Sequence, residues 1–302
     1  MGVSVLLSFV TVLAWGTWIP VAQIVPGVPQ RSSIFYVAVG NAILAAAALI
    51  VVGGQLSLGW REFWLPLAGG LVWTVGSFAA FRASETIGLA RAAGTWTPLN
   101  IIMAFVWGAL LFGELRDFGA TRVAVLVAAF VVMSAGVVMV VSARDAQPSD
   151  RGAAVRKAAS SQRAGLLWAT VTGVLWGSYF VPAQWAKVPA QVANFPLALG
   201  ILLAASVLAV SAGEPVRLSQ KITALQVAAG LLFGIGNVAL LGLVSRVGTG
   251  AGFTIAQLSL LVNASIGIWV FKVPRPGTRP AKIAMAGIVL AGVGGGVIGA
   301  IR

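Results

Sequence analysis

The sequence contains no cysteine and no histidine. Its side chains therefore cannot form a disulfide framework, a reactive thiolate or a Cys/His metal site. Charge is also scarce, because only 9% of the 302 residues are charged, whereas a soluble domain carries roughly a quarter. No Gly-Lys dipeptide occurs, so the chain has no P-loop and no sign of direct ATP coupling. We expect neither a metal nor a cofactor.

Long apolar blocks are what the chain has instead. Hydrophobic residues make up 59% of it and fall into blocks of about 20 residues, the length that crosses a hydrocarbon core about 30 Å thick. Ten blocks are predicted, at approximately 4–25, 34–52, 64–81, 92–112, 119–141, 165–186, 194–212, 222–243, 250–271 and 282–301. This pattern predicts an all-α membrane protein with ten transmembrane helices, in the cell (inner) membrane.

Basic residues lie almost entirely between these blocks and not on one contiguous face, although the net charge is +13. This placement argues against nucleic-acid binding and for a role in membrane topology. Fourteen of the 20 Lys and Arg residues lie on the side opposite the N-terminus, which the positive-inside rule assigns to the cytoplasm. Both termini are then predicted to face outward.

The chain divides into two related halves. Residues 142–164, which are polar and basic, are predicted to form a flexible cytoplasmic loop between five helices in residues 1–141 and five in residues 165–302. The stretch Trp-Gly-Thr-Trp-Ile-Pro-Val-Ala-Gln at 15–23 returns at 176–184 as Trp-Gly-Ser-Tyr-Phe-Val-Pro-Ala-Gln. Further matches at near-constant offsets pair Gly76, Ala79 and Gly88 with Gly236, Ala239 and Gly248, and Leu99, Gly108 and Phe112 with Leu258, Gly267 and Phe271.

The odd number of spans in each half has a consequence for orientation. A unit of five spans that is repeated in tandem must enter the membrane in the opposite sense the second time. We therefore predict two inverted five-helix repeats, related by a pseudo-two-fold axis in the membrane plane. This architecture is typical of secondary transporters, in which the substrate site lies near the midplane at the repeat interface.

Four aromatic residues of the repeated stretch are candidate substrate contacts: Trp15, Trp18, Trp176 and Tyr179. A spacing of three places each pair on one helix face, beside a proline that frees backbone groups. Flat aromatic faces at membrane depth suit stacking against a sugar ring or another flat ligand. Ordinary packing is the alternative, and it is our interpretation of the deep Trp73 and Trp107.

Seven amides lie within or near the ends of the apolar blocks: Gln23, Asn41, Asn100, Gln184, Asn237, Gln257 and Asn263. Five of them, Gln23, Asn100, Gln184, Asn237 and Gln257, are the second set of candidate substrate contacts. An unpartnered amide is costly in lipid, so each must face protein, water or ligand. Interhelical hydrogen bonds, worth about 1 kcal/mol or less each, are the alternative use. Together with the aromatic residues, the amides favour a neutral polar cavity for an uncharged polyhydroxylated or ureide-like solute.

Proton coupling usually requires a carboxylate in the transport pathway. The sequence has only seven acidic residues, and none lies at the centre of an apolar block. Glu85, just past the third block, is the best candidate for coupling. A salt bridge with Arg82 in a loop is the alternative.

The last apolar block carries small residues at a spacing of four, at Gly287, Ala291, Gly295 and Gly299. Such a face lets helices approach closely. We expect packing within the monomer, and a homodimer contact through the same face is the other use.

Together these features resemble the drug/metabolite transporter superfamily and, within it, the bacterial glucose/ribose-type sugar uptake permeases, which are related to the rhamnose–proton symporters. The residues that carry the resemblance are the Trp-Gly-Thr-Trp stretch at 15–18 with its copy at 176–179, the segment 76–88, and the Gly…Phe-x-x-x-Gln segment at 248–257. The resemblance covers nearly the whole chain and implies facilitated or proton-coupled uptake of a sugar. Two segments depart from it: 91–100 is less serine-rich than expected, and 271–274 lacks the acid that often closes the ninth helix.

We therefore expect a secondary transporter that takes up a neutral sugar by alternating access, coupled to protons or to no ion. Export of drugs, metabolites, nucleobases or ureides by a protein of the same superfamily is the alternative. An intramembrane enzyme would need paired acids, a histidine or a metal cluster at depth, which the sequence does not offer. A receptor or assembly protein would not move its ligand across the membrane.

Overall fold

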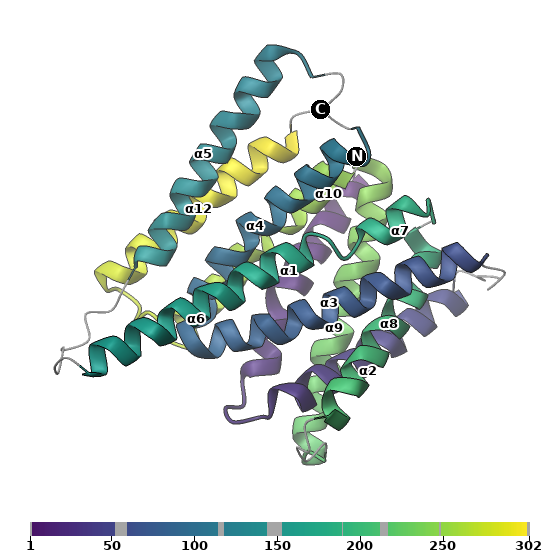
Figure 1. The fold of residues 1–302 in the computed structure, drawn as a ribbon, viewed down its shortest axis with the longest axis horizontal. Helices are drawn as coiled ribbons and strands as arrows, with labels where there is room; N and C mark the ends of the chain where they lie inside the picture. The colour runs from purple at the N-terminus through teal and green to yellow at the C-terminus, as the bar shows by residue number, and fades with distance from the viewer. Residues whose placement is uncertain are drawn as a thin grey trace.

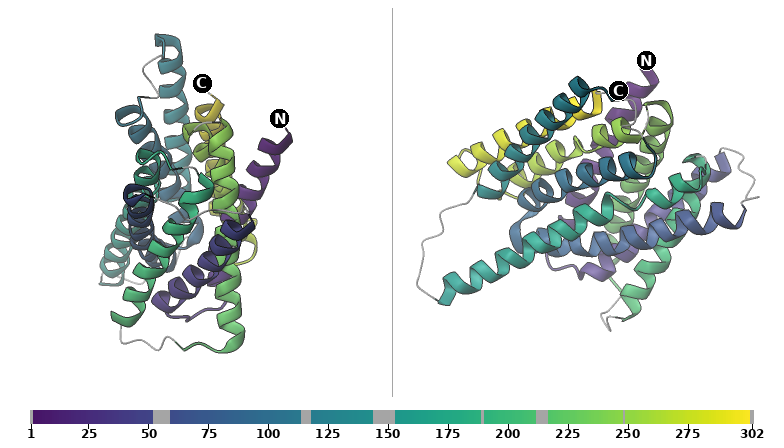
Figure 2. Two further views of the ribbon diagram at one scale, coloured as in Figure 1. Left: turned by 90° about the vertical axis from the view of Figure 1, so that its right-hand side faces the viewer. Right: turned by 45° about the horizontal axis from the view of Figure 1, so that its top comes forward.

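The computed structural model describes residues 2–51, 59–113, 118–143, 153–188, 190–211, 217–247 and 249–300. All regular elements in these ranges are helices, and nine of the helices are long and apolar enough to cross a membrane. The predicted all-α membrane class is thereby confirmed. The start of α1 (Gly2–Gln23) and the end of α12 (Arg279–Ala300) lie at the same end of the bundle in every view (Figures 1 and 2).

The first half of the chain forms five helices in the predicted order. They are α1, α2 (Gln30–Val51), α3 (Trp60–Ile87), α4 (Leu89–Leu110) and α5 (Ala120–Ser142). Helix α3 extends beyond the predicted block at 64–81, because Arg82 and Glu85 are good helix formers that continue it past the apolar segment. Gly88, with a backbone φ of 80° that suits glycine, separates α3 from α4.

The described residues of the second half form seven helices, because two of its predicted spans are broken. They are α6 (Ala153–Trp176), α7 (Val181–Trp185), α8 (Ala190–Ser211), α9 (Gln220–Val247), α10 (Thr249–Ala256), α11 (Ser259–Trp269) and α12. Residues 177–180 form a turn between α6 and α7, and Pro182 stands at the start of α7, where its missing N–H costs nothing. Gln257 and Leu258 form a turn between α10 and α11.

Helix α6 begins earlier than the sequence predicted. Residues 153–164 belong to this helix, whereas they were expected in the flexible loop at 142–164. Their Ala, Arg and Lys residues have high helix propensity, which explains the difference. Residues 144–152 of the expected loop lie outside the described ranges.

Helices of the two halves cross in close contact at matched positions. A Cβ atom on Gly40 of α2 would collide with the carbonyl oxygen of Val227 in α9, and one on Gly200 of α8 would collide with that of Leu67 in α3. Each member of the first contact differs by 160 in residue number from its counterpart in the second. Small residues allow this approach, and the contacts repeat at the offset found in the sequence.

Helices α5 and α12 lie side by side at one edge of the bundle (Figure 1). A Cβ atom on Gly136 of α5 would lie 2.5 Å from the backbone nitrogen of Ala291, and one on Gly287 would lie 2.8 Å from the Met139 Cβ atom. The first two members of the predicted small-residue stripe therefore pack within the monomer, as expected.

Candidate functional site

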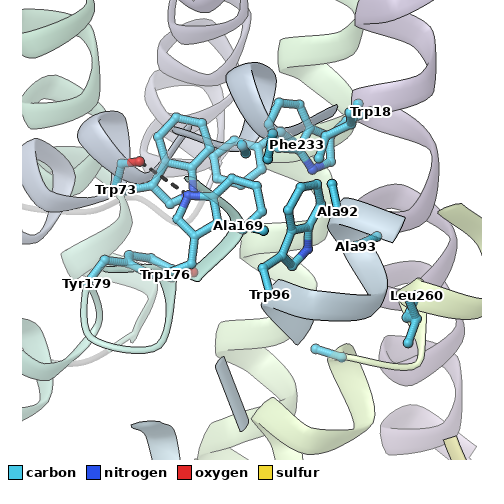
Figure 3. Packing of buried hydrophobic residues seen from close by; sticks show 14 of the residues in the cluster. Trp18, Trp73, Ala92, Ala93, Trp96, Ala169, Trp176, Tyr179, Phe233 and Leu260 are labelled. Carbon is cyan, nitrogen blue, oxygen red and sulfur yellow. Dashed lines mark hydrogen bonds between the residues drawn. The ribbon is translucent and has the colours of Figure 1, made fainter. Parts of the chain in front are cut away.

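Aromatic side chains from four helices meet in the core of the bundle (Figure 3). Trp18 of α1 lies 5.8 Å from Trp73 of α3 and 6.0 Å from Trp176 of α6, measured between ring centroids. Phe233 of α9 lies 4.3 Å from Trp73 and 5.2 Å from Trp18. All four are buried, and their separations lie in or near the range in which aromatic rings attract one another.

Two members of this cluster were not predicted as site residues. Trp73 was assigned to ordinary packing, and Phe233 was not singled out. They differ by 160 in number and contact one another, so the internal offset is the signal that would have paired them. Trp96 of α4, which lies 5.4 Å from Trp176, was also missed, although it stands one helical turn before the predicted Asn100.

The aromatic cluster encloses a small cavity, which we call the cage. Its lining residues are Trp15, Trp18, Ile19, Trp73, Trp96, Thr97, Asn100, Trp176, Tyr179, Phe233, Phe253, Gln257, Ser259 and Asn263. None of them is an Asp, Glu, Lys or Arg. The cavity volume of about 30 Å³ holds roughly two water molecules, since one needs about 10–15 Å³. The cage is therefore closed to a sugar-sized molecule in this conformation.

Amide side chains form the polar part of the cage. The Asn100 Nδ2 atom donates to Gln257 Oε1 over 3.4 Å, and the Asn263 Nδ2 atom donates to the Trp15 carbonyl oxygen over 3.4 Å. Asn100 Oδ1 and Asn263 Oδ1 accept no hydrogen bond from the described residues, and Gln257 Nε2 and Trp15 Nε1 find no acceptor among them. The cage thus presents two unused acceptors and two unused donors, each costly to leave unpaired.

The indoles of the two repeated tryptophans differ in their hydrogen bonding. Trp176 Nε1 donates to the Trp73 carbonyl oxygen over 3.2 Å, as Figure 3 shows. Trp15 Nε1 has no such partner in the described part of the chain. Each indole packs on a matched glycine, since a Cβ atom on Gly76 would lie 2.7 Å from Trp176 Cδ1, and one on Gly236 would overlap Trp15.

The structure brings six of the predicted site residues together and separates the others. The six in the cage are Trp15, Trp18, Asn100, Trp176, Tyr179 and Gln257. Gln23 follows Trp15 by eight residues, which is about 12 Å along a helix with a rise of about 1.5 Å per residue, and it therefore lies outside the cage. Gln184, Asn237 and Glu85 also lie outside it, in two larger cavities.

A cavity of about 480 Å³ lies on the side of the bundle where α1 begins, and we call it the N-side vestibule. It is lined by Phe112, Tyr179, Phe180, Ala183, Gln184, Lys187, Val188, Ala193, Asn194, Leu197, Asn237, Leu240, Leu241, Val244, Ser245 and Phe253. Tyr179 and Phe253 also line the cage, and their ring centroids are 6.5 Å apart. These two side chains form the wall between the vestibule and the cage.

A cavity of about 490 Å³ lies on the other side of the bundle, where α1 ends, and we call it the distal vestibule. It is lined by Ala22, Gln23, Val25, Pro26, Gly27, Val28, Ser33, Phe81, Ser84, Glu85, Gly88, Leu89, Gly267, Phe271 and Val273. Glu85 lies in the last turns of α3 and forms no ion pair within the described residues, so the loop salt bridge considered for it is not present. Arg82 instead lies over the Phe78 ring, at 5.6 Å.

The small, uncharged cage lies between two larger cavities in a bundle whose long apolar helices are those of an integral membrane protein. The chain belongs to the family described as "Sugar transport protein", whose sequence model matches residues 6–301. Family membership confirms the resemblance to sugar uptake permeases that the sequence indicated, and it identifies a membrane permease of the sugar transport class.

Individual relatives are distant but match along most of their length. A protein of Listeria innocua with the provisional name of a sugar uptake protein is 22% identical over 99% of both chains. A Staphylococcus aureus protein provisionally named for ribose uptake is 26% identical over 95% of both chains. A solved crystal structure matches with a TM-score of 0.67 over 97% of this chain and 96% of that one, at 21% identity, which shows a shared fold.

Proposed function

We propose that the protein is a secondary transporter that takes up a small neutral polar solute, above all a monosaccharide, by alternating access through the cage. The supporting observation is the set of unpaired groups that line an uncharged aromatic cavity: Trp15 Nε1, Gln257 Nε2, Asn100 Oδ1 and Asn263 Oδ1. A sugar hydroxyl both donates and accepts, so neighbouring hydroxyls can satisfy these groups in pairs. The names of the relatives support the same solute class.

The aromatic residues would contribute orientation and the exclusion of water. The faces of Trp18 and Trp176 suit the apolar C–H surface of a sugar ring, while the amides select for its hydroxyls. Binding would pair groups that are unsatisfied in the empty cage, and this pairing favours the conformation that encloses the solute. The absence of charged residues from the lining disfavours ionic cargo.

We further propose that residues 1–141 and 165–302 are inverted repeats. The two vestibules would then connect alternately with the cage, one at a time. Matched contacts support this proposal: Gly40 on Val227 with Gly200 on Leu67, and Gly76 on Trp176 with Gly236 on Trp15. The vestibules contain matched residues as well, with Gln23 and Phe271 in one and Gln184 and Phe112 in the other. A rocking motion of the halves would enlarge one vestibule toward the cage while the other closes.

Proton coupling, where the cycle uses it, is assigned to Glu85. The cage contains no carboxylate, and Glu85 is the acid that lines either vestibule in the described structure. Its solvent-exposed side chain reaches water on the distal side. If uptake is facilitated and not coupled to an ion, Glu85 has no role in coupling.

Counterflow of radiolabelled D-ribose and D-glucose into proteoliposomes tests the proposal. The wild-type protein is expected to exchange at least one of these sugars, and Gln257→Leu to abolish exchange because it removes the shared amide of the cage. Trp185→Phe, at an exposed position, serves as the matched control and should exchange normally. Normal exchange by Gln257→Leu would reject the cage as the site, and exchange of uracil but of neither sugar would favour the nucleobase alternative.

A further inference from the structure

We propose that the N-side vestibule contains a second binding site for a neutral polyhydroxylated solute, which holds the solute before it enters the cage. Its anchors are the amides of Asn194 in α8 and Asn237 in α9, both of which line this vestibule. The inference rests on the proposed function for the class of solute. The position and residues of the site follow from separate observations.

The first observation is the burial of two unsatisfied amides. Asn194 is 3% exposed and Asn237 is 2% exposed. The nitrogen and oxygen atoms of both side-chain amides lack a hydrogen-bond partner among the described residues. An unpaired buried polar group is costly, and here four of them belong to residues that line a single cavity. Hydroxyls that both donate and accept would satisfy them.

The second observation is the available space. The N-side vestibule has a volume of about 480 Å³, within the roughly 300–1,000 Å³ that is usual for ligand pockets, whereas the cage has about 30 Å³. In this conformation a sugar therefore fits beside Asn194 and Asn237 but not in the cage. The sugar would contact Tyr179 and Phe253, which separate the vestibule from the cage. These two side chains must move before the sugar can enter the cage.

The third observation is that the distal vestibule has no equivalent pair. The positions that match Asn194 and Asn237, at the offset of 160 that relates α2 to α8 and α3 to α9, are Ile34 and Ser77. Ile34 has an apolar side chain, and the Ser77 hydroxyl donates to the Trp73 carbonyl oxygen over 3.0 Å. Neither matched position leaves a buried amide unpaired, so the second site is proposed on one side only.

The chemistry of the lining favours a neutral solute. Lys187 is the charged residue among those that line the N-side vestibule, and its side chain is exposed. The amides of Asn194 and Asn237 carry no charge and offer equal numbers of donor and acceptor atoms. This set fits a polyol or sugar better than an anion, for which acceptor oxygens would be unfavourable.

The test replaces both asparagines with serine, the residue at the position that matches Asn237, in the double variant Asn194→Ser/Asn237→Ser. A serine on a helix can bond to the preceding turn, as Ser77 does, so the variant is expected to fold. Uptake of radiolabelled D-ribose and D-glucose is measured in vesicles of each orientation. The half-saturating concentration should rise about tenfold when sugar is offered on the N side, the loss expected for one to two hydrogen bonds, and change less than twofold on the distal side.

Ser84→Ala is the matched control, because Ser84 is a buried distal-vestibule residue whose hydroxyl lacks a partner in the described structure. It should leave the N-side half-saturating concentration unchanged. An unchanged value in the double variant, or equal increases on both sides, would overturn the proposal and assign the amides to ordered water or to structure.

Equilibrium binding separates this proposal from that of the cage. Gln257→Leu protein should still bind labelled sugar at the vestibule, and addition of Asn194→Leu and Asn237→Leu should abolish that binding. If Gln257→Leu transports normally, the cage assignment fails while the vestibule remains testable by the double variant. If Gln257→Leu abolishes both transport and all binding, the vestibule site is rejected and the cage stands.

Discussion

The two copies of the repeated stretch share four of nine residues and have different conformations. Helix α1 continues without interruption from Trp15 through Pro20, whereas α6 ends at Trp176 and the chain turns before α7 begins at Val181. The Trp15 indole finds no acceptor among the described residues, while the Trp176 indole donates to the Trp73 carbonyl oxygen. Under the proposed alternating access, each half would adopt the conformation of the other in turn.

The helices that carry the cage amides show the same difference between halves. Helix α4 is continuous around Asn100, and its counterpart is broken into α10 and α11 at Gln257. At this break Leu258 and Leu260 donate to carbonyls three residues earlier, over 3.0 Å in each case, which tightens the turn. If the protein alternates its access as proposed, the two halves are expected to exchange these conformations, and four predictions test the comparison.

The largest expected effect follows from enlarging the two glycines that contact the indoles of Trp176 and Trp15. Gly76→Val and Gly236→Val would each overlap an indole, and overpacking typically costs about 1–3 kcal/mol. We expect a lower thermal unfolding temperature and loss of sugar counterflow in both variants. Gly296→Ala, at a position with open space around it, is the control and should retain stability and transport. Equal behaviour of all three would contradict the packing argument.

The next effect should separate the two tryptophans. Trp176→Phe removes the bond to the Trp73 carbonyl and should reduce the free energy of unfolding by about 1 kcal/mol. Trp15→Phe breaks no indole bond within the described structure, so it should reduce stability less and raise the half-saturating sugar concentration several-fold instead. Thermal unfolding and counterflow, measured on both variants, check this contrast. A larger loss of stability in Trp15→Phe than in Trp176→Phe would contradict this prediction.

A smaller effect is expected at the turn itself. Trp107 Nε1 donates to the Ser178 hydroxyl over 2.8 Å, and the position that matches Trp107, at the offset of 159 found for Gly108 and Gly267, is Ile266, whose side chain has no donor. Trp107→Phe should weaken the turn by about 0.5–1.5 kcal/mol and make residues 177–180 exchange amide hydrogens faster. Unaltered amide-hydrogen exchange at residues 177–180 would show that the Trp107–Ser178 hydrogen bond does not stabilise the turn between α6 and α7.

The smallest effect on transport itself should come from Glu85→Gln. Glu85 and its match at the offset of 160, Ser245, line opposite vestibules, so one side has a carboxylate where the other has a hydroxyl. Glu85→Gln should leave counterflow within about twofold and abolish accumulation driven by a pH gradient. Normal gradient-driven accumulation in the variant would remove Glu85 from the coupling mechanism. A wild-type protein that never accumulates sugar would show facilitated transport.

Sequence reasoning predicted the spans well, because each apolar block must be about as long as the bilayer is thick. It did not predict the breaks at 177–180 and 257–258. The shared residues Trp, Gly, Ala and Gln do not decide the first break, since α1 remains helical through its copy of them. The break after Trp176 is instead accompanied by tertiary contacts, such as the Trp107 bond to Ser178.

For the site, repetition pointed to Trp15, Trp18 and Trp176 of the cage, but it also grouped Gln23 and Gln184 with them. Sequence proximity to Trp15 and Trp176 was misleading, because a separation of eight residues along a helix carries a side chain about 12 Å away. Phe253 and Asn263 reach the cage only because α10 and α11 pack against α1 and α4. Their positions depend on the arrangement of distant helices, which no local pattern contains.

The uncharged lining of the cage has an electrical consequence. A group that carries charge through the membrane field changes its energy by about 2.3 kcal/mol per elementary charge for each 100 mV. In the proposed cycle, a neutral solute enclosed by tryptophans and amides carries none, so the loaded cage would change its access without moving solute charge against the membrane potential. Uptake through it should therefore proceed at the same rate in polarised and depolarised vesicles, unless a proton travels with the solute.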